Sequence, residues 1–336
     1  MTSLILGIET SCDETSAAVL ADGRVLKSHI IASQTDVHQR YGGVVPEIAS
    51  REHCLRIDAV VEQAMQEAES AFSDLAAVAV TYGPGLVGSL LVGVSYAKAL
   101  AYAARLPLIG VNHLEGHVFA NVLEHPELSY PLLALLASGG HTNILYFEDP
   151  IHYRVLGRTR DDAAGEALDK VARALGLGYP GGPLIEQAAL RGNEQAFELP
   201  RALLEPGSLD FSFSGMKSAV LNLLNTAHMR GQTLNFNDVA ASFQRAVVDV
   251  LVTKALMAVD QVGPVNTFAL AGGVAANARL RTLMAEAMKG RGIHFVSPSP
   301  RLCTDNGAMI ATAGYYYYQA GIVSSWKLNA IPGLNF

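Results

Sequence analysis

The chain has 336 residues, of which half are apolar and 16% are charged, and its formal net charge is -7. This length predicts two packed domains, and the composition excludes a disordered chain. The acidic balance argues against a protein that binds nucleic acid through its global charge, so a nucleic-acid substrate would require local basic patches or a partner. Three cysteines without Cys-x-x-Cys spacing exclude a cysteine zinc knuckle and suit a reducing compartment.

The N-terminus and the most apolar region of the chain predict a cytoplasmic protein without membrane association. Residues 1–9 lack a basic region and end on an acidic residue, which does not fit a signal peptide. The longest apolar region, residues 78–104, is interrupted by glycines, a proline and a lysine, which does not fit a membrane span.

The first half of the chain opens with two apolar runs on either side of a polar turn. Residues 4–8 and 17–20 are the apolar runs, and residues 9–16 are the turn, so we predict a hairpin of two strands. The segments that follow are an amphipathic helix, a buried strand and a helix rich in small residues, at residues 50–68, 76–80 and 86–104.

The second half repeats this opening. Residues 132–137 and 144–147 are apolar runs around the turn at residues 138–143. A buried strand is predicted at residues 267–271, and helices are predicted at residues 162–175, 237–262, 276–289 and 306–319. Alternating strands and helices, with a hairpin at the start of each half, predict an α/β fold built from a duplicated domain with a cleft between the copies.

Three glycine-rich turns of the second half can bring backbone N–H groups close to a phosphate; they lie at residues 138–142, 179–183 and 272–277. Asn277 could contact a base or a ribose. Glu186 could bind ribose hydroxyls, although a carboxylate one turn into a helix also simply stabilises the helix N-terminus. The first turn alone is also typical of a plain hairpin. The chain has neither a P-loop nor a Gly-x-Gly-x-x-Gly fingerprint. Together the turns favour a nucleotide site between two lobes, as in actin, Hsp70 and sugar kinases.

His113 and His117 are four residues apart, so on a helix they share a face and can bind one metal ion. A zinc protease places its general-base glutamate directly after the first histidine, where this chain has Leu114. Glu115 is two residues from each histidine and therefore lies roughly 200° around the helix from both. Asp305 is a candidate third ligand for iron or zinc, and N-capping of the helix at residues 306–319 is an equally good explanation of it.

Nine motifs together resemble one family, the universal tRNA threonylcarbamoyladenosine transferases, once catalogued as sialoglycoprotein endopeptidases because of the histidine pair. The motifs cover nearly the whole chain in the family's order: LGIETSCDETS, YGGVVPEIASREH, GPGLVGSLLVG, VNHLEGH, SGGHT, DDAAGEALDKVARALGLGYPGGP, LDFSFSGMKS, AGGVAAN and CTDNGAM. The pattern Ser-Gly-Gly-His is similar to that of the bacterial branch.

The resemblance implies a duplicated actin-like fold of the ASKHA and RNase H-like type, with metal and nucleotide in the interlobe cleft. Residues 1–128 and 306–336 would form the first lobe, with the metal histidines and the dimerisation helices at residues 50–68 and 86–104. Residues 129–305 would form the second, nucleotide-binding lobe. The implied metal ligands, for one iron or zinc ion, are His113, His117 and Asp305. The implied substrate-binding residues are Leu136, Ala137, Ser138, Gly139, Gly140, Asp169, Gly182, Glu186 and Asn277.

The resemblance also implies a reaction and its partners. The threonylcarbamoyl group would pass from threonylcarbamoyl-AMP to the N6 amine of the adenosine 3' of the anticodon, in tRNAs that read codons beginning with A, and AMP would leave. Asp13 or Glu14 would accept the proton of the attacking amine, although both residue types also form turns. A paralogous actin-like subunit and a small P-loop ATPase are the expected partners, besides tRNA.

Two other classes of function stay open on the residues alone. A metal-dependent protease or hydrolase is favoured only by the motif HLEGH, and the position of Glu115 argues against it. A non-catalytic actin-like scaffold is the second alternative, and the histidine pair argues for the catalytic member instead. A sugar kinase is weaker, and it would have to turn over ATP with a small polyol.

Overall fold

The computed structural model describes residues 2–202 and 205–336, and the chain divides into two compact units. Unit 1 consists of Met1–Leu128 and Pro298–Phe336, and unit 2 is Ser129–Ser297. We expected the chain to return to the first lobe at residue 306, but it does so at Pro298. The reason is that the short helix α10 (Pro300–Cys303) contacts the histidine helix of unit 1, and the Ser299 amide donates a hydrogen bond to Glu124. Asp305 therefore belongs to unit 1.

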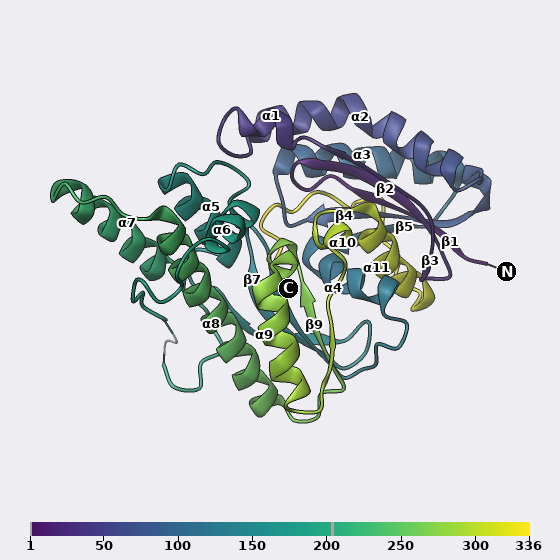
Figure 1. The fold of residues 1–336 in the computed structure, drawn as a ribbon. Helices are drawn as coiled ribbons and strands as arrows, with labels where there is room; N and C mark the ends of the chain where they lie inside the picture. Colours follow the sequence, from purple (N-terminus) through teal and green to yellow (C-terminus); the bar gives the residue numbers. More distant parts are fainter. Residues whose placement is uncertain (1, 203–204) are drawn as a thin grey trace. The chain divides into compact units, whose positions relative to one another are not determined.

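Unit 1 is built on a five-stranded sheet in the order β3-β2-β1-β4-β5 (Figure 1). Its strands are β1 (Leu4–Glu9), β2 (Glu14–Ala21), β3 (Val25–Ser33), β4 (Leu75–Gly83) and β5 (Leu108–Asn112). The first three strands are antiparallel neighbours, whereas β4 runs parallel to both β1 and β5. The strand β2 begins earlier than predicted, because Glu14 to Ser16 pair with β3, a strand that we did not predict.

Helices cover both faces of this sheet. The helices α2 (Pro46–Glu67) and α3 (Val87–Ala104) pack on one face, where Leu6, Ile8 and Val19 join the core. The helices α4 (His113–Glu124) and α11 (Gly307–Gln319) pack on the other face, where Ile5, Ala18 and Leu20 point. Alternate residues of each strand thus serve separate cores, as the two-residue period of a strand requires. The short helices α1 (Thr35–Gln39) and Phe72–Asp74 complete unit 1 together with α10.

The helix α3 is long and apolar enough to span a membrane by length and composition alone. Its inner residues Leu90, Val94, Ala97 and Ala101 are buried, and three of them belong to the core beneath α2. This packing is that of a core helix laid on a sheet.

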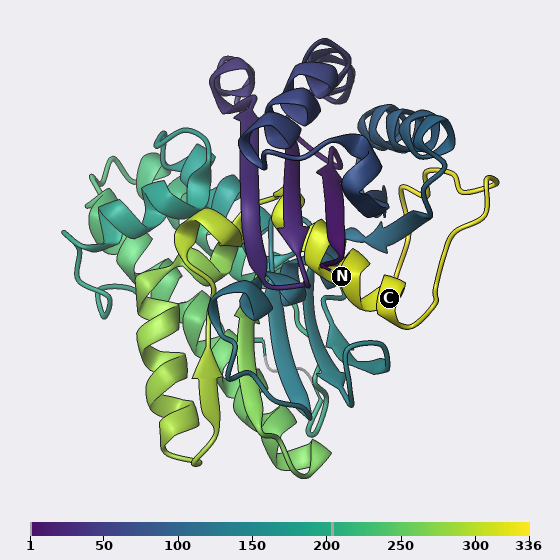
Figure 2. The same cartoon turned by 90° about the vertical axis from the view of Figure 1, so that its right-hand side faces the viewer.

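The C-terminal segment of unit 1, residues 321–336, is an irregular loop (Figure 2) that bonds to β5 and to the end of β4. The Ser324 amide donates to the Leu108 carbonyl at 2.8 Å, and the Ile331 amide donates to the Tyr82 carbonyl at 2.8 Å. The Pro332 carbonyl accepts from the amide of Gly85, in the turn that leads into α3. The segment therefore fixes the loops at one end of the sheet.

Unit 2 repeats the sheet of unit 1, with the order β10-β9-β6-β7-β8. Its strands are β6 (Leu132–Ala137), β7 (Thr142–Phe147), β8 (Tyr153–Arg158), β9 (Thr267–Ala271) and β10 (His294–Val296). Again three antiparallel neighbours are extended by two parallel strands. Its helices are α5 (Ala164–Ala174), α6 (Gly181–Ala189), α7 (Ser214–Met229), α8 (Phe236–Val262) and α9 (Ala278–Lys289), with a 3-10 turn at Gly273–Ala276. The predicted duplication is confirmed.

Candidate metal centre and glycine-rich turns

The histidine pair lies in the first two turns of α4. The Asn112 side chain caps this helix by accepting from the Leu114 amide at 2.9 Å. Because His113 and His117 are four residues apart, their rings lie on one face, with centroids 4.7 Å apart and planes at 77°. Both side chains are buried. The turn from β5 into α4 therefore places two imidazoles side by side inside unit 1.

Asp305 completes a three-residue cluster with these histidines. Its Oδ1 atom lies 3.4 Å from His113 Nε2 and 3.2 Å from His117 Nε2. The three ligand atoms all lie within 4.8 Å of one another, a spacing that can hold a metal ion. The explanation of Asp305 as a helix cap is wrong, because Asn306 is the cap of α11 and accepts from the Met309 amide at 2.9 Å.

Glu9 sets the orientation of His113. Its carboxylate is fully buried at the end of β1, and its Oε2 atom lies 3.0 Å from His113 Nδ1 and accepts from the Thr81 hydroxyl at 2.6 Å. Because a carboxylate only accepts, Nδ1 must carry a proton. The Nε2 atom, which faces Asp305, is then the coordinating nitrogen, as in many metal sites in which a carboxylate orients a histidine ligand.

The electrostatics of the cluster favour a cation at its centre. Burial lowers the pKa of His113, but the charges of Asp305 and Glu9 outweigh burial and raise this pKa to about 9. Burial raises the pKa of Asp305, but His113 and His117 outweigh it and lower this pKa to about 2. In the described part of the chain, neither ring nitrogen of buried His117 makes a hydrogen bond of good geometry. A metal ion bound to His117 Nε2, the nitrogen nearest Asp305, would give it a partner, so the residues fit a metal.

Glu115 points away from the histidines. Its buried carboxylate accepts a hydrogen bond from the Tyr317 hydroxyl of α11. A glutamate held in this direction cannot activate a water on a metal bound by His113 and His117. The hydrogen bond to Tyr317 agrees with the sequence argument against Glu115 as a protease base.

Asp13 and Glu14 lie where the β1–β2 turn enters β2. Asp13 is buried, and burial raises the pKa of Glu14 well above its usual value, with the charges of Asp13 and Asp305 adding to the effect. The influence of Asp305 on Glu14 shows that this turn and the metal cluster belong to one electrostatic neighbourhood within unit 1. Sequence reasoning missed Glu9 and the buried Thr81, although a glutamate at the end of an apolar strand is itself a signal.

The β6–β7 turn of unit 2 presents open backbone. The Leu136 and Ala137 side chains are buried, so any ligand contact there must come from their backbone. Ser138 closes the turn by donating from its amide to the His141 carbonyl at 2.8 Å. Gly139 and Gly140 are exposed, and no heavy atom lies within 4 Å of where a Cβ would stand. Their amides point to no hydrogen-bond acceptor within the described residues.

Two other glycines let the backbone approach this turn closely. A Cβ at Gly165, in the first turn of α5, would lie 2.5 Å from the Ser138 carbonyl oxygen. Gly272 has a φ of 83°, and a Cβ there would lie 2.5 Å from the Ala137 carbonyl oxygen. The glycine-rich turns at residues 138–142 and 272–277 therefore lie next to each other.

The other predicted substrate-binding side chains accept hydrogen bonds from backbone amides at the starts of helices in unit 2. Asp169 of α5 accepts from the Gly181 amide at 2.7 Å, beside Gly182 at the start of α6. Glu186 accepts from the Ala278 amide at 2.7 Å, so it caps α9 and not its own helix. Asn277 caps α9 through the Leu280 amide, and its Nδ2 atom donates to Gln244 at 2.9 Å. Asp169, Glu186 and Asn277 are thus each held by hydrogen bonds at the start of a helix in unit 2.

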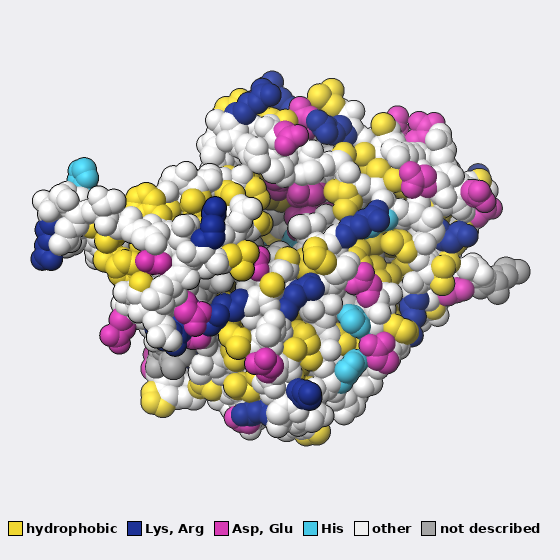
Figure 3. Space-filling model, in the orientation of Figure 1, with side chains coloured by type: hydrophobic (Ala, Val, Ile, Leu, Met, Phe, Trp, Pro, Cys, Tyr) yellow, Lys and Arg dark blue, Asp and Glu magenta, His cyan; other side chains and the backbone are white. Residues whose placement is uncertain are grey.

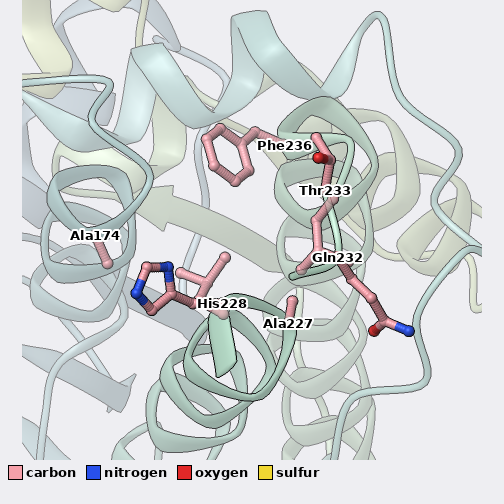
Figure 4. A pocket seen from close by; sticks show the side chains of 8 residues that line it. Ala174, Ala227, His228, Gln232, Thr233 and Phe236 are labelled. Carbon is pink, nitrogen blue, oxygen red and sulfur yellow. The ribbon is translucent and has the colours of Figure 1, made fainter. Parts of the chain in front are cut away.

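A pocket of about 340 Å³ lies elsewhere in unit 2, where α5, α7 and the start of α8 meet (Figure 4). The labelled side chains around it include His228, Gln232, Thr233 and Phe236. None of the predicted site residues lines this pocket. We therefore do not connect it with the metal cluster or with the glycine-rich turns.

Solved structures define the class of the fold. The chain is similar to HypF of T. kodakarensis, with a TM-score of 0.64 at 15% identity over 97% of this chain and 49% of that one. It is also similar to component A of the (R)-2-hydroxyglutaryl-CoA dehydratase of Acidaminococcus fermentans, with a TM-score of 0.55 at 16% identity over 95% and 99% of the two chains. At these identities the likeness shows the fold alone. The chain is an actin-like α/β protein with a duplicated domain.

Sequence comparisons identify the family. The family model described as tRNA N6-adenosine threonylcarbamoyltransferase matches residues 25–312. A protein of that name from Desulfitobacterium hafniense (strain Y51) is 68% identical over 98% of this chain and 97% of its own length. Another from Clostridioides difficile (strain 630) is 54% identical over 98% of each chain. The chain belongs to the tRNA N6-adenosine threonylcarbamoyltransferase family and is a transferase.

Proposed function

We propose that the chain transfers the threonylcarbamoyl group from threonylcarbamoyl-AMP to the N6 amine of the adenosine 3' of the anticodon, in tRNAs that read codons beginning with A. The amine nitrogen forms a bond to the carbamoyl carbon, the bond from that carbon to the phosphate oxygen breaks, and AMP leaves with the electron pair. The amine proton passes to a base. The observation that carries this proposal is the cluster of His113, His117 and Asp305 in a chain 68% identical to a curated transferase.

The cluster would hold one divalent metal ion, and two imidazoles with one carboxylate suit iron, with zinc as the alternative. When bound, such an ion would polarise the carbamoyl carbonyl as a Lewis acid. Glu9 would keep His113 in the coordinating tautomer by accepting its Nδ1 proton, at the distance of 3.0 Å already described. The activated adenylate then requires positioning more than a nucleophile from the protein.

Unit 2 would bind the AMP part of the donor. The exposed amides of Gly139 and Gly140 would donate to its phosphate. The backbone at Leu136 to Ser138 would shape the same turn. Asp169, Gly182, Glu186 and Asn277 would contact the ribose and adenine. The hydrogen bonds of Asp169, Glu186 and Asn277 to helix ends support this proposal, because side chains already ordered by the protein can orient a ligand with little further loss of entropy.

Asp13 or Glu14 would accept the proton of the attacking amine. The raised pKa of Glu14 supports this proposal, because a carboxylate with a higher pKa is a stronger base. The effect of the Asp305 charge on the pKa of Glu14 also supports a base close to the metal ligands.

We also propose that this chain works with partner proteins in the cytoplasm. On α2 and α3 the apolar residues Leu55, Val87 and Tyr102 are 76%, 55% and 74% exposed, and we assign these helices to a paralogous actin-like subunit. In unit 2, Arg160, Arg279 and Arg291 form ion pairs with acidic residues. Lys and Arg side chains are dispersed among acidic ones on the face in Figure 3. Strong tRNA binding would therefore require partner proteins. One of these would be a P-loop ATPase, and the complex would work in the cytoplasm.

The test is reconstitution with purified components. The metal-loaded chain and its two partner proteins are incubated with threonylcarbamoyl-AMP and unmodified tRNA, and the modified nucleoside and AMP are measured by mass spectrometry. We expect equal amounts of both products, formed only when metal is present. AMP release without tRNA modification would indicate a hydrolase and contradict the proposal.

A further inference from the structure

A series of buried polar side chains, connected by hydrogen bonds, joins the α1–α2 segment of unit 1 to the turn that carries Asp13 and Glu14. It consists of His38, Gln34, His53 and Thr15, and each of these side chains is at most 1% exposed. Gln34 precedes α1, His38 lies in α1, His53 lies in α2 and Thr15 lies in β2. None of the three metal ligands belongs to this hydrogen-bonded series, and none of its four residues was predicted to take part in the reaction.

The direction of every hydrogen bond around His53 follows from its partners. The ring Nε2 atom lies 2.9 Å from the Cys12 carbonyl oxygen, and a carbonyl only accepts, so Nε2 carries the proton. The ring Nδ1 atom must then accept, and the Thr15 hydroxyl donates to it at 2.7 Å. The Gln34 Nε2 atom is a second, longer donor at 3.5 Å. Burial lowers the pKa of His53, which agrees with a neutral ring.

The same reasoning gives the donor and the acceptor of each remaining hydrogen bond in the series. The Gln34 Oε1 atom accepts from His38 Nε2 at 3.1 Å. His38 Nδ1 in turn accepts from the Val45 amide, one residue before α2, at 3.3 Å. The donors and acceptors therefore run in a single direction from Val45 to Cys12, and protonation of either ring would leave two donors facing each other.

The series ends in two hydrogen bonds that hold the backbone on either side of Asp13. His53 donates to the carbonyl of Cys12, which precedes Asp13, and the Gln34 amide donates to the carbonyl of Asp13 itself at 3.0 Å. The peptide groups on both sides of the Asp13 Cα atom are thus held by the α1–α2 segment. Fixing these two peptides fixes the direction of the Asp13 side chain and the start of β2 at Glu14.

We propose that His53 is a positioning residue, which holds Asp13 and Glu14 in their working orientation by donating its Nε2 proton to the Cys12 carbonyl. This inference rests on the proposed function, in which Asp13 or Glu14 accepts the amine proton. His53 is neither one of the three metal ligands nor a predicted substrate-binding residue, so we expect it to affect the catalytic step and not binding.

A pair of substitutions separates this role from mere core packing. In His53→Gln the amide Nε2 atom takes the place of the ring Nε2 and can still donate to Cys12, whereas in His53→Asn the side chain reaches only the place of Nδ1. We measure kcat, the KM for tRNA, the metal content and the free energy of unfolding for both variants in the reconstituted complex. We expect kcat of the glutamine variant within about threefold of wild type and that of the asparagine variant roughly 100-fold lower, with KM and metal content unchanged.

Equal kcat values for the two variants, or losses that follow their unfolding free energies, would overturn the proposal. If either variant fails to fold, Thr15→Val and Thr15→Ser replace them: the serine keeps the donor to His53 Nδ1, and only the valine is expected to lose kcat. Asp13→Asn and Glu14→Gln are assayed beside them. Full activity of both acid variants would refute the proposed proton acceptors. If the acid variants are inactive but the two His53 variants have equal kcat values, only the role proposed for His53 is refuted.

Discussion

The β1–β2 turn of unit 1 and the β6–β7 turn of unit 2 occupy the same place in two copies of one sheet, yet they carry opposite chemistry. The first turn follows buried Glu9 and contains buried Thr10, Ser11 and Asp13. The second contains exposed Gly139 and Gly140, whose Cβ positions face open space. One hairpin is therefore filled with acidic and hydroxyl side chains, and the other presents bare backbone.

This difference shows how duplication can separate two tasks. Side-chain oxygens and imidazoles hold cations and move protons, whereas unhindered N–H groups bind anions. We therefore assign the metal and the proton transfer to unit 1 and the phosphate to unit 2. Exchanging the properties of the two turns, residue by residue, tests this assignment.

The largest effect is expected from the metal ligands. His117→Ala and Asp305→Ala each remove one of the three ligands, so we expect the metal to be lost and the transfer rate to fall roughly 1,000-fold, equivalent to about 4 kcal/mol. Metal content by mass spectrometry and single-turnover rates are the measurements. His152→Ala is the control, because this histidine is exposed in unit 2. Normal metal content in both ligand variants would contradict the assignment.

A smaller effect is expected from Glu9, which orients a ligand without touching the metal. Glu9→Gln removes the charge that holds the His113 Nδ1 proton, and we expect metal affinity to fall by about 10- to 100-fold. Isothermal titration of metal-free protein measures it. Glu115→Gln is a matched control, because it is also a buried glutamate but bonds to Tyr317 on α11. Equal losses of affinity in the two variants would show that burial, and not orientation, matters.

Unit 2 is tested by two glycines with different surroundings. Gly140→Ala adds a Cβ where no atom lies within 4 Å, so the unfolding free energy is expected to change by less than about 0.5 kcal/mol. If its amide binds phosphate, the KM for the adenylate rises roughly tenfold. Gly272→Ala, with φ of 83° and a carbonyl at 2.5 Å, is expected to destabilise the fold by about 1–3 kcal/mol. Calorimetry and kinetics distinguish the two, and an unchanged KM in Gly140→Ala would remove the phosphate site.

The smallest effect concerns pH in the metal-free protein. The pKa of His113 is raised from 6.5 to about 9, so its contribution to the unfolding free energy is complete below pH 6.5 and is lost as pH rises through about 9. The pKa of Asp305 is lowered from 3.8 to about 2, so its contribution is complete above pH 3.8 and is lost as pH falls through about 2. Urea unfolding should therefore show stability declining above pH 6.5, and less so in His113→Gln.

Metal binding has the opposite pH dependence in the same range. The metal competes with the Nε2 proton of His113, so metal affinity should rise roughly 100-fold between pH 6.5 and 9. Titration of metal-free protein over this range measures the affinity. An affinity that does not change with pH would mean that His113 loses no proton when metal binds.

Much of the fold could be predicted from the sequence because its signals are local. Apolar runs around residues 9–16 and 138–143 predict both hairpins, and the long helices show their period. The strands β3, β5, β8 and β10 and the helix α7 were not predicted. In β3 and β8 charged or polar residues break the apolar pattern, as in YRVLGR, and β10 has only three residues. Such strands are defined by their neighbours and not by their own composition.

The site was predictable only in part for the same reason. The spacing of His113 and His117 indicates a shared face, and the resemblance adds Asp305. The partners that make the site specific lie far away in sequence: Glu9 is 104 residues from His113, and Glu186 is 92 residues from Ala278. No local pattern connects such pairs, so the orientation of His113 and the cap on α9 required the structure.

We propose that the metal held by His113, His117 and Asp305 drives transfer to tRNA. The most direct measurement is the single-turnover rate of tRNA modification, in the complex with threonylcarbamoyl-AMP, as metal is added back to stripped wild-type protein and to Asp305→Ala. We predict a wild-type rate proportional to metal occupancy up to one ion per chain, with no recovery in the variant. A full rate in metal-free wild-type protein, or recovery of Asp305→Ala at the same occupancy, would contradict the claim.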